Sequence, residues 1–498
     1  MENFWLGLNN LLDLQVLIAL FVGAIGGMVI GAIPGIGPAI AISILLPATI
    51  FLPDLVSLIL LLGVYGSSMY GGAIPAILIN TPGTPVNALS TYDGYALTKQ
   101  GNPAKALSIA YSSSFFGGCF SVLIALSSLI AFGPYLQNVG ALFGQRDIFM
   151  AALLGSVLLI IAHRQNMVIA ALLFSFGFLI AMVGRQSTRG IQRFTFDIEY
   201  LAAGFNLIVV IVGIFAISQA LNLLTGKDTD PPVAPLKGTF FQGFFELSKY
   251  KKVPLFSACY GTLMGIIPGV GEFVAQFFSY STARAFSKTP ERFGHGAPEG
   301  LIASETSNNS VPAAAMIPLL ALGVPGEALT AMMMVVFFDA GIKPGPDIFE
   351  NNSDFLFSLF TALLLVNILV FVTLLFSTKL FTKVILIPNR FLGAFILILS
   401  FIGIFSIRNS FVDCAFAAGF GYIGFIFRRL DWPLVPIVLG MVLGSIMIER
   451  LTAGASQIKT IYDLVNRPVS GTLFTAIVII ILVTIFLSLR KHILRRLR

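Results

Sequence analysis

The chain has 498 residues, of which 57% are hydrophobic and 11% are charged, and its mean hydropathy is +0.92. Soluble domains carry about 25% charged residues, so this composition excludes a soluble globular protein and indicates a polytopic membrane protein. The net charge of +7 does not indicate nucleic-acid binding, because the basic residues occupy short loops and the C-terminus instead of one folded surface with interleaved aromatics.

Apolar runs long enough to cross a bilayer, about 20 residues each, recur along the chain. They occupy 15–33, 55–71, 106–132, 148–162, 166–184, 205–221, 254–274, 312–340, 355–377, 391–407, 411–427, 434–448 and 472–489. We therefore predict an all-α polytopic membrane protein with about 10–12 transmembrane helices and additional broken or re-entrant helices.

Two of these apolar regions contain the same helix-breaking pattern. Gly31-Ala-Ile-Pro-Gly-Ile-Gly37 and Gly265-Ile-Ile-Pro-Gly-Val-Gly271 both read G-x-I-P-G-x-G. A second pair of Pro-Gly segments, Thr81-Pro-Gly-Thr84 and Val324-Pro-Gly-Glu327, follows in the same order. A broken helix at membrane depth is tolerated only where it is buried in protein or lines a polar cavity. The pairs therefore predict a duplicated fold with a binding site near the membrane midplane, as in secondary transporters.

A polar segment divides the chain into two halves. We predict a first repeat over residues 1–225, a polar linker over 226–252 that opens with Gly226-Lys-Asp-Thr-Asp-Pro-Pro232, and a second repeat over 253–498. Each repeat contains one G-x-I-P-G-x-G break and one later Pro-Gly break.

Charge predicts that the two repeats have opposite orientations in the membrane. The loop after Thr81-Pro-Gly-Thr84 is basic, with Lys99 and Lys105. The loop after Val324-Pro-Gly-Glu327 carries Asp347, Glu350 and Asp354 against a single Lys343. Basic loops prefer the cytoplasm, so we predict inverted-topology repeats. The basic end of the chain, from Arg490 to Arg498, predicts a cytoplasmic C-terminus.

The helix breaks also predict where an anion binds. A half-helix that begins after Pro-Gly has free N–H groups and a positive dipole end, which attract carboxylates without a buried Arg or Lys. Neutral amides and hydroxyls next to the breaks add donors and carbonyl acceptors, although the same residues would also cap broken helices. The residues predicted to bind substrate are Pro34, Gly35, Gly37, Asn80, Thr81, Pro82, Gly83, Thr84, Gly269, Gly271, Asn308, Asn309, Pro325 and Gly326.

Acidic residues near the breaks are candidates for cation coupling, because a carboxylate inside a membrane is costly and marks functional sites. We predict ion coupling by Ser304, Glu305 and Glu272, with a Na⁺ site near Asn80 and Asn308, whose oxygens are hard ligands. Glu272 and Glu327 have the alternative role of capping the helices that they begin. No His cluster indicates a transition metal, so the only expected cofactor is a coupling ion, Na⁺ or H⁺.

Enzyme signatures are absent from the sequence: there is no G-x-S-x-G elbow, no H-E-x-x-H, and Gly226-Lys227 is followed by Asp228 instead of Ser or Thr. We predict a secondary transporter and not an enzyme. A channel or uniporter is the main alternative, since the same breaks can build one. A membrane transferase that uses Glu272 and Glu305 as acid and base is disfavoured, because no nucleophile or phosphate cradle accompanies them.

The ordered motifs resemble the large membrane subunit of the tripartite tricarboxylate transporter family. Beyond the two G-x-I-P-G-x-G segments, the resemblance is carried by Tyr70-Gly-Gly72, Leu78-Ile-Asn-Thr-Pro-Gly-Thr-Pro85, Asp93-Gly-Tyr95, Lys99-Gln-Gly101, Phe293-Gly-His-Gly296, Glu299-Gly300, Glu305-Thr-Ser-Asn-Asn309, Leu322-Gly-Val-Pro-Gly326 and Gly341-Ile-Lys-Pro-Gly-Pro346. The match departs at Ala303-Ser304-Glu305, where the family usually has Ala-Pro-Glu, and at the acidic Glu272.

The resemblance implies cation-driven uptake of organic tricarboxylates or dicarboxylates, such as citrate, across a bacterial inner membrane. It further implies two protein partners, a periplasmic solute-binding protein that delivers the carboxylate and a small membrane subunit. For the mechanism we expect alternating access of an elevator-like kind, in which the Pro-Gly elements move against a scaffold of the remaining spans.

Overall fold

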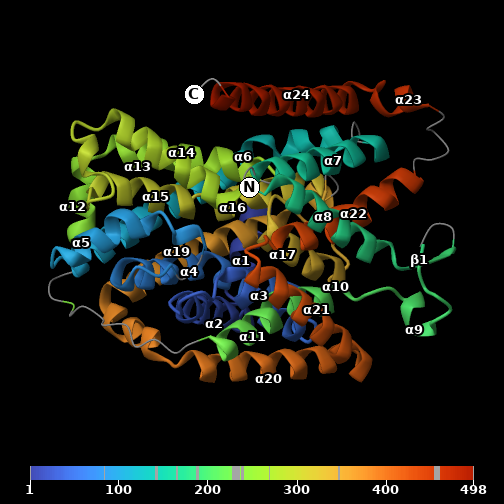
Figure 1. Cartoon of the computed structure of the whole chain (residues 1–498), viewed down its shortest axis with the longest axis horizontal. Coiled ribbons are helices and arrows are strands. Elements are labelled where there is room, and N and C mark those ends of the chain that lie inside the picture. The colour runs from blue at the N-terminus through green and yellow to red at the C-terminus, as the bar shows by residue number, and fades with distance from the viewer. Residues whose placement is uncertain are drawn as a thin grey trace.

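The computed structural model describes residues 2–82, 85–140, 144–163, 166–186, 190–226, 236, 241–268, 270–345, 348–453 and 460–496. Within these ranges the regular structure is almost entirely helical, so the predicted all-α fold class is confirmed (Figure 1). The described exception is a small antiparallel ribbon of β1 (Gly184–Arg185) and β2 (Gln192–Arg193).

Ten helices of the described ranges are long and apolar enough to cross a bilayer, in agreement with the predicted number. They are α2 (Leu14–Gly31), α4 (Asp54–Ile79), α6 (Pro103–Gly140), α7 (Gln145–Ala162), the continuous stretch α10 (Leu207–Ile211), η3 (Val212–Ile217) and α11 (Ser218–Thr225), α19 (Ser353–Phe381) with η5 (Thr382–Leu386), α20 (Asn389–Arg408), α21 (Phe411–Arg429), α22 (Val435–Ala453) and α24 (Pro468–Arg496).

Shorter helices fill the space between these spans. Those of eight residues or more are α1 (Glu2–Asn10), α3 (Pro38–Thr49), α8 (Met167–Met182), α12 (Gln242–Lys249), α13 (Lys252–Ile266), α14 (Gly271–Phe286), α15 (Pro298–Asn309), α16 (Val311–Leu322) and α17 (Ala328–Asp339). The remaining short turns are η1 (Pro85–Asn87), η2 (Thr91–Tyr95), α5 (Ala96–Lys99), α9 (Glu199–Ala202), η4 (Pro290–Arg292), α18 (Ile348–Asn351) and α23 (Ile461–Val465).

The helix breaks predicted from the G-x-I-P-G-x-G pattern are confirmed. The first break lies between the end of α2 at Gly31 and the start of α3 at Pro38, and Gly35 has φ = 77°. The second break lies between α13 and α14, where Gly271 has φ = 66°. Both angles are left-handed, a conformation that glycine adopts without steric cost. The apolar run 312–340 is likewise interrupted, between α16 and α17.

Small residues bring α2 and α4 into close contact at the centre of the molecule. A Cβ atom added to Gly27 of α2 would lie 2.0 Å from Ser67 Oγ of α4, and one added to Gly71 would lie 2.4 Å from the Met28 carbonyl oxygen. Backbones approach this closely only through small residues, the packing mode that membrane helices favour. α4 is buried over nearly its whole length, so it forms the core on which the site is built.

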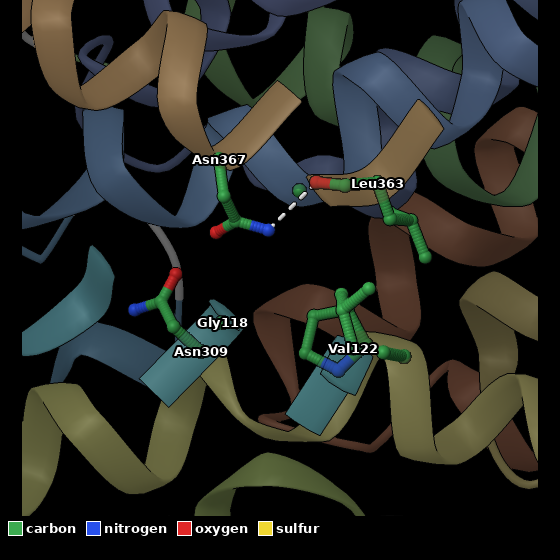
Figure 2. Close-up of a pocket in the computed structure, with 8 residues that line it drawn as sticks. Gly118, Val122, Asn309, Leu363 and Asn367 are labelled. Atoms are coloured by element: carbon green, nitrogen blue, oxygen red, sulfur yellow. Dashed lines mark hydrogen bonds between the residues drawn. The ribbon is translucent and has the colours of Figure 1, made fainter. Parts of the chain in front are cut away.

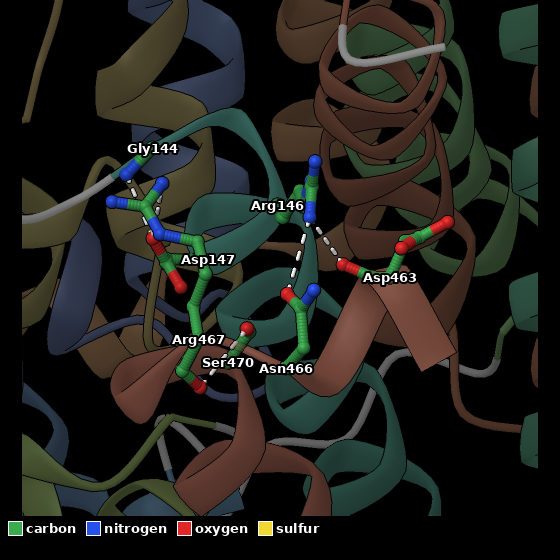
Figure 3. Close-up of polar contacts among 7 residues, drawn as sticks. All are labelled: Gly144, Arg146, Asp147, Asp463, Asn466, Arg467 and Ser470. Atoms are coloured by element: carbon green, nitrogen blue, oxygen red, sulfur yellow. Dashed lines mark hydrogen bonds and ion pairs between the residues drawn. The ribbon is translucent and has the colours of Figure 1, made fainter. Parts of the chain in front are cut away.

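The C-terminal helix α24 lies along the edge of the molecule (Figure 1). Arg467, which directly precedes α24, forms an ion pair of 3.4 Å with the buried Asp147 of α7 (Figure 3). Arg146 adds a hydrogen bond of 3.3 Å to Asn466 Oδ1 and another to the carbonyl oxygen of Asp463. These contacts attach the segment that precedes α24 to the start of α7.

The division into repeats stays a prediction. Much of the predicted linker, 226–252, lies outside the described residues, but its last part forms α12, which packs against α6. Glu246 of α12 forms an ion pair of 2.5 Å with Lys105. The inverted orientation of residues 1–225 and 253–498 likewise stays a prediction.

Candidate functional site

The polar helix α15 is enclosed by other helices over its whole length. All twelve of its residues are buried, and they include the run from Ser304 to Asn309. α15 packs against α6, α13 and α14 (Figure 1). Added Cβ atoms at Gly117 of α6 and Gly261 of α13 would lie 2.2 and 2.3 Å from carbonyl oxygens of this run. Such contacts require glycine, so both neighbouring helices are shaped to hold a polar helix at close range.

Glu305 lies at the centre of this arrangement and has no solvent exposure. Its carboxylate accepts hydrogen bonds from Ser114 Oγ at 3.0 Å, from Asn87 Nδ2 at 3.4 Å, and from Ser90 Oγ. All three donors are neutral and come from the first half of the chain. Burial of a carboxylate is costly unless hydrogen bonds, a proton or a cation compensate its charge, and these three donors compensate part of it.

Asn309 extends the hydrogen-bond network of Glu305. Its Nδ2 donates to Ser114 Oγ at 2.8 Å and to the Glu305 carbonyl oxygen at 3.1 Å. Asn309 also borders a cavity of about 10 Å³ together with Asn367 of α19, as Figure 2 shows. Asn367 accepts a hydrogen bond of 2.8 Å from Tyr70. A cavity of this size holds about one water molecule, so a tricarboxylate does not fit in it in this conformation.

Asn308 is fully buried, and neither its Oδ1 nor its Nδ2 has a hydrogen-bond partner. The hydroxyl of Thr306 on the same helix is also unpartnered. Buried polar groups are almost always paired in folded proteins, so an unpaired carboxamide is expected to bind a ligand or water. Ser304, in contrast, donates to the carbonyl oxygens of Gly300 and Leu301, both at 3.1 Å.

A second acidic cluster lies at the second helix break. The Tyr65 hydroxyl of α4 donates to Glu327 Oε1, and the carboxyl of Glu272 lies within hydrogen-bonding reach of both groups. The backbone of Glu327 is the N-cap of α17, and Glu272 is in the first turn of α14. The predicted capping positions are therefore correct, and the two carboxyl groups also face one another. A Cβ atom at Gly271 would lie 3.9 Å from Glu327 Oε2.

Three polar residues at helical spacing on α14 contact the first half of the chain. Glu272 faces Tyr65, Gln276 donates to the Val86 carbonyl oxygen, and Tyr280 donates to Asp93 Oδ2 at 2.9 Å. Residues four apart on a helix share one face. This stripe therefore lies along the boundary between the two halves.

Asp93 anchors the turn that leads into α15. Its Oδ1 accepts three backbone hydrogen bonds, from Gly294 at 2.8 Å, Gly296 at 2.9 Å and Ala297 at 2.8 Å. Gly294 and Gly296 have φ = 85° and 96°, which turn these N–H groups toward one acceptor. Burial raises the pKa of the Asp93 carboxyl, and the hydrogen bonds oppose that shift. Asp93 thus joins η2 of the first half to α15 of the second.

In the first break, a Cβ atom added to Gly35 would approach no carboxyl group. Gly35 is exposed, and a Cβ atom there would lie 3.4 Å from Gln219 Nε2 of α11. Pro34 is partly buried, and Gly37 is the N-cap of α3 without a side-chain hydrogen bond. The break therefore places the Gln219 amide beside the positive end of α3, although Pro38 has no N–H and the N–H groups of Ile40 and Ala41 both donate to the Gly37 carbonyl oxygen.

Asn80 and Thr81 are exposed at the end of α4. Asn80 has φ = 57°, and its N–H donates to the Pro75 carbonyl oxygen, so it ends the helix as the capping alternative describes. Pro82 follows and is partly buried. The predicted site residues Gly83, Thr84 and Gly269 lie outside the described residues.

Pro325 and Gly326 are buried in the break between α16 and α17. A Cβ atom at Gly326 would lie 3.6 Å from the carbonyl oxygen of Gly265, so the two Pro-Gly elements of the second half meet. Among the described glycines, none brings the first G-x-I-P-G-x-G break into contact with the second.

Sequence reasoning did not identify several residues that complete the site. The partners of Glu305, which are Asn87, Ser90 and Ser114, and the residues Tyr65 and Gln276 near Glu272, were not among the predicted site residues. A signal existed in Ser112-Ser113-Ser114, a polar run inside an apolar span. Intramembrane polar runs of this kind usually face the interior of a helix bundle.

Comparison with known proteins supports one family. A sequence model of the tripartite tricarboxylate transporter TctA family matches residues 17–439. Over 456 residues, covering 90% of this chain and 89% of the relative, the chain is 32% identical to an "uncharacterized 52.8 kDa protein in TAR-I ttuC' 3'region" of Agrobacterium vitis. A second A. vitis protein, "uncharacterized protein in TAR-II ttuC' 3'region", is 35% identical over 191 residues, which cover 38% of this chain and 79% of that protein. No solved structure matches the chain. The family match spans most of the chain, and we conclude that the chain belongs to the tripartite tricarboxylate transporter TctA family.

Proposed function

We propose that this protein carries out cation-coupled uptake of organic tricarboxylates or dicarboxylates, citrate among them, across a bacterial inner membrane. The observation that carries the proposal is the fully buried Glu305, whose three hydrogen-bond donors are all neutral. A carboxylate in this setting needs a cation or a proton, and exchange of that ion with water on either side would couple an ion gradient to transport.

The substrate carboxylate would bind through neutral donors. Asn308, with its unpaired carboxamide, and the N-terminus of α3 after Gly37 are suited to hold carboxylate oxygens. The other residues of the first break and of the Thr81-Pro-Gly-Thr84 segment would complete the site when it opens. Selectivity among carboxylates would be shared with the protein that delivers the substrate.

Alternating access of an elevator-like kind would open and close this site. The cavity beside Asn309 has room for about one water, so substrate entry requires a rearrangement of the helices around α15. The helix breaks that precede α14 and α17 supply points where the backbone can move without unfolding a span.

The partners that we propose are a periplasmic solute-binding protein and a small membrane subunit. The family is tripartite, which supports an assembly of this chain with further subunits. In this assembly the chain would span the inner membrane many times, with its basic C-terminus in the cytoplasm.

The proposal is tested by uptake into proteoliposomes that contain this chain and the small subunit, with the binding protein outside. Labelled citrate, dicarboxylates and aromatic acids would be compared under Na⁺, choline and pH gradients. Accumulation of a carboxylate above its external concentration, dependent on a cation gradient and on the binding protein, is expected. Equilibration independent of any gradient would instead identify a channel or uniporter.

A further inference from the structure

We propose that Glu272, Gln276 and Glu327, together with Tyr65, form a Na⁺ site that is separate from Glu305. The proposal rests on the cation-coupled uptake described above and names the ion and the residues for one coupling site. It is independent of the identity of the carboxylate.

This region contains buried oxygen atoms that accept no hydrogen bond. Glu272 Oε1 and Gln276 Oε1 have no hydrogen-bond partner, and both side chains are more than nine-tenths buried. Gln276 already uses its Nε2 to donate to the Val86 carbonyl oxygen. Its oxygen is therefore left as an acceptor. Unpartnered acceptors require either a donor or a cation, and the carboxamide oxygen is a neutral hard ligand of the kind that Na⁺ prefers.

The oxygens of this region come from adjacent turns of α14 and from two neighbouring helices. Glu272 and Gln276 are one turn apart on the same face of α14, and Glu327 and Tyr65 approach Glu272 from α17 and α4. Oxygen ligands thus come from three helices and from both halves of the chain. A cation there would hold the second break closed against α4.

Na⁺ accounts for these oxygens better than a shared proton does. Two carboxyl groups in mutual reach repel one another unless a positive charge lies between them. A shared proton would join Glu272 and Glu327 but would leave Gln276 Oε1 unpartnered. A metal cation contacts several oxygens at once and could bind the unpartnered oxygens of Glu272 and Gln276 together, which favours Na⁺.

The Tyr65–Glu327 contact of this site lies at a different level of α4 from the hydrogen-bond network of Glu305. Tyr65 contacts Glu327, whereas the Met69 carbonyl oxygen, one turn further along α4, accepts from Asn87, which also donates to Glu305. One helical turn advances about 5.4 Å along the axis. The transport pathway would therefore contain two positions that bind a cation.

The test is the thermal unfolding of the purified full chain in detergent, with NaCl, KCl or choline chloride at equal ionic strength. The wild type is expected to unfold several degrees higher in NaCl than in the other salts, because an ion that binds only the folded state stabilises it. Glu327→Gln and Gln276→Leu should lose this Na⁺-specific shift. Tyr65→Phe, which keeps the aromatic packing, should require a higher Na⁺ concentration for the same shift.

Two further variants are matched controls. Glu299→Gln changes a buried glutamate of α15 whose Oε2 is also unpartnered but which bonds Ser287, and it should keep the full shift. Glu305→Gln should keep a Na⁺-specific shift that Glu327→Gln lacks. The proposal is overturned if the wild type shows no Na⁺-specific shift, if Glu327→Gln and Gln276→Leu both keep it, or if only Glu305→Gln loses it.

Uptake measured in parallel separates this inference from the proposed function. Concentrative uptake driven by a pH gradient, with no Na⁺-specific stabilisation, would refute the Na⁺ site and leave the transporter function standing. Absence of concentrative uptake under every gradient would refute the proposed function itself.

Discussion

The first break, between α2 and α3, and the second break, between α13 and α14, begin with the same sequence pattern and contain a left-handed glycine. Their surroundings differ. Gly35 faces the amide of Gln219, and α3 continues with Pro38 and apolar residues. Gly271 faces Glu327, and α14 continues with Glu272. Pro and Gly therefore determine where the helix breaks. The residues that follow determine whether the break would attract an anion or a cation.

This difference suggests opposite roles for two breaks that share a sequence pattern. A helix N-terminus without a nearby carboxylate keeps its positive end available to an anion. Glu272 in the first turn of α14 neutralises that end and adds negative charge. Under the proposed function, the first break would bind the substrate carboxylate and the second would bind the coupling cation.

The largest effect is expected at Asp93, which ties the second half to the first. Asp93→Ala would leave three backbone N–H groups and the Tyr280 hydroxyl without an acceptor. At about 1–3 kcal/mol for each buried unpaired group, the folded state should lose about 3 kcal/mol or more. Thermal unfolding in detergent measures this loss. Asp93→Asn keeps the acceptor and should cost far less; equal losses in the two variants would contradict the anchoring role.

Glu305→Gln should lower concentrative uptake by roughly 10- to 100-fold, because hydrogen bonds to a charged group contribute about 1.5–3 kcal/mol. The neutral amide keeps the size of the side chain but no longer needs a cation. Initial rates of gradient-driven uptake measure the effect, and Glu299→Gln on the same helix serves as the matched control. An uptake rate and cation dependence equal to those of the wild type would remove Glu305 from the mechanism.

Gly35→Ala and Gly271→Ala should each cost about 1–2 kcal/mol of stability, because alanine is strained at positive φ. Their transport phenotypes should diverge. Gly35→Ala should raise the KM for the carboxylate, whereas Gly271→Ala should raise the Na⁺ concentration for half-maximal uptake. Titrations of each solute at a saturating level of the other measure both values. The same phenotype in both variants would abolish the contrast between the breaks.

The smallest effect is expected at Asn80, which ends α4 with φ = 57°. At this position the residue must above all adopt a left-handed backbone conformation. Asn80→Gly should change the free energy of unfolding by less than about 0.5 kcal/mol, whereas Asn80→Ala should cost about 1 kcal/mol. Unfolding curves of the two variants test the capping role. A raised KM for citrate in Asn80→Gly, at unchanged stability, would reveal a substrate contact in addition.

The sequence predicted the helical fold and the breaks because both follow from local rules. Long apolar runs require membrane helices, and Pro-Gly segments cannot continue one. Glu305 and Asn308 were recognisable for a similar reason, since five consecutive polar residues from Glu305 to Asn309 are unusual in such a chain.

The partners of these residues were not predictable from the same rules. Ser114 and Glu305 are 191 positions apart, and their contact depends on how α6 packs against α15. Tyr65 lies in an apolar span whose periodicity gives no indication that its hydroxyl meets Glu327. Asn80 shows the converse: two local interpretations were available, and the structure displays the helix-ending conformation.

The most direct test of the central claim is the simultaneous uptake of radioactive sodium and labelled citrate into proteoliposomes containing the complete assembly. We expect that citrate stimulates Na⁺ entry, that Na⁺ stimulates citrate entry, and that Glu305→Gln loses both effects. Citrate accumulation by the wild type without accompanying Na⁺ entry would contradict it.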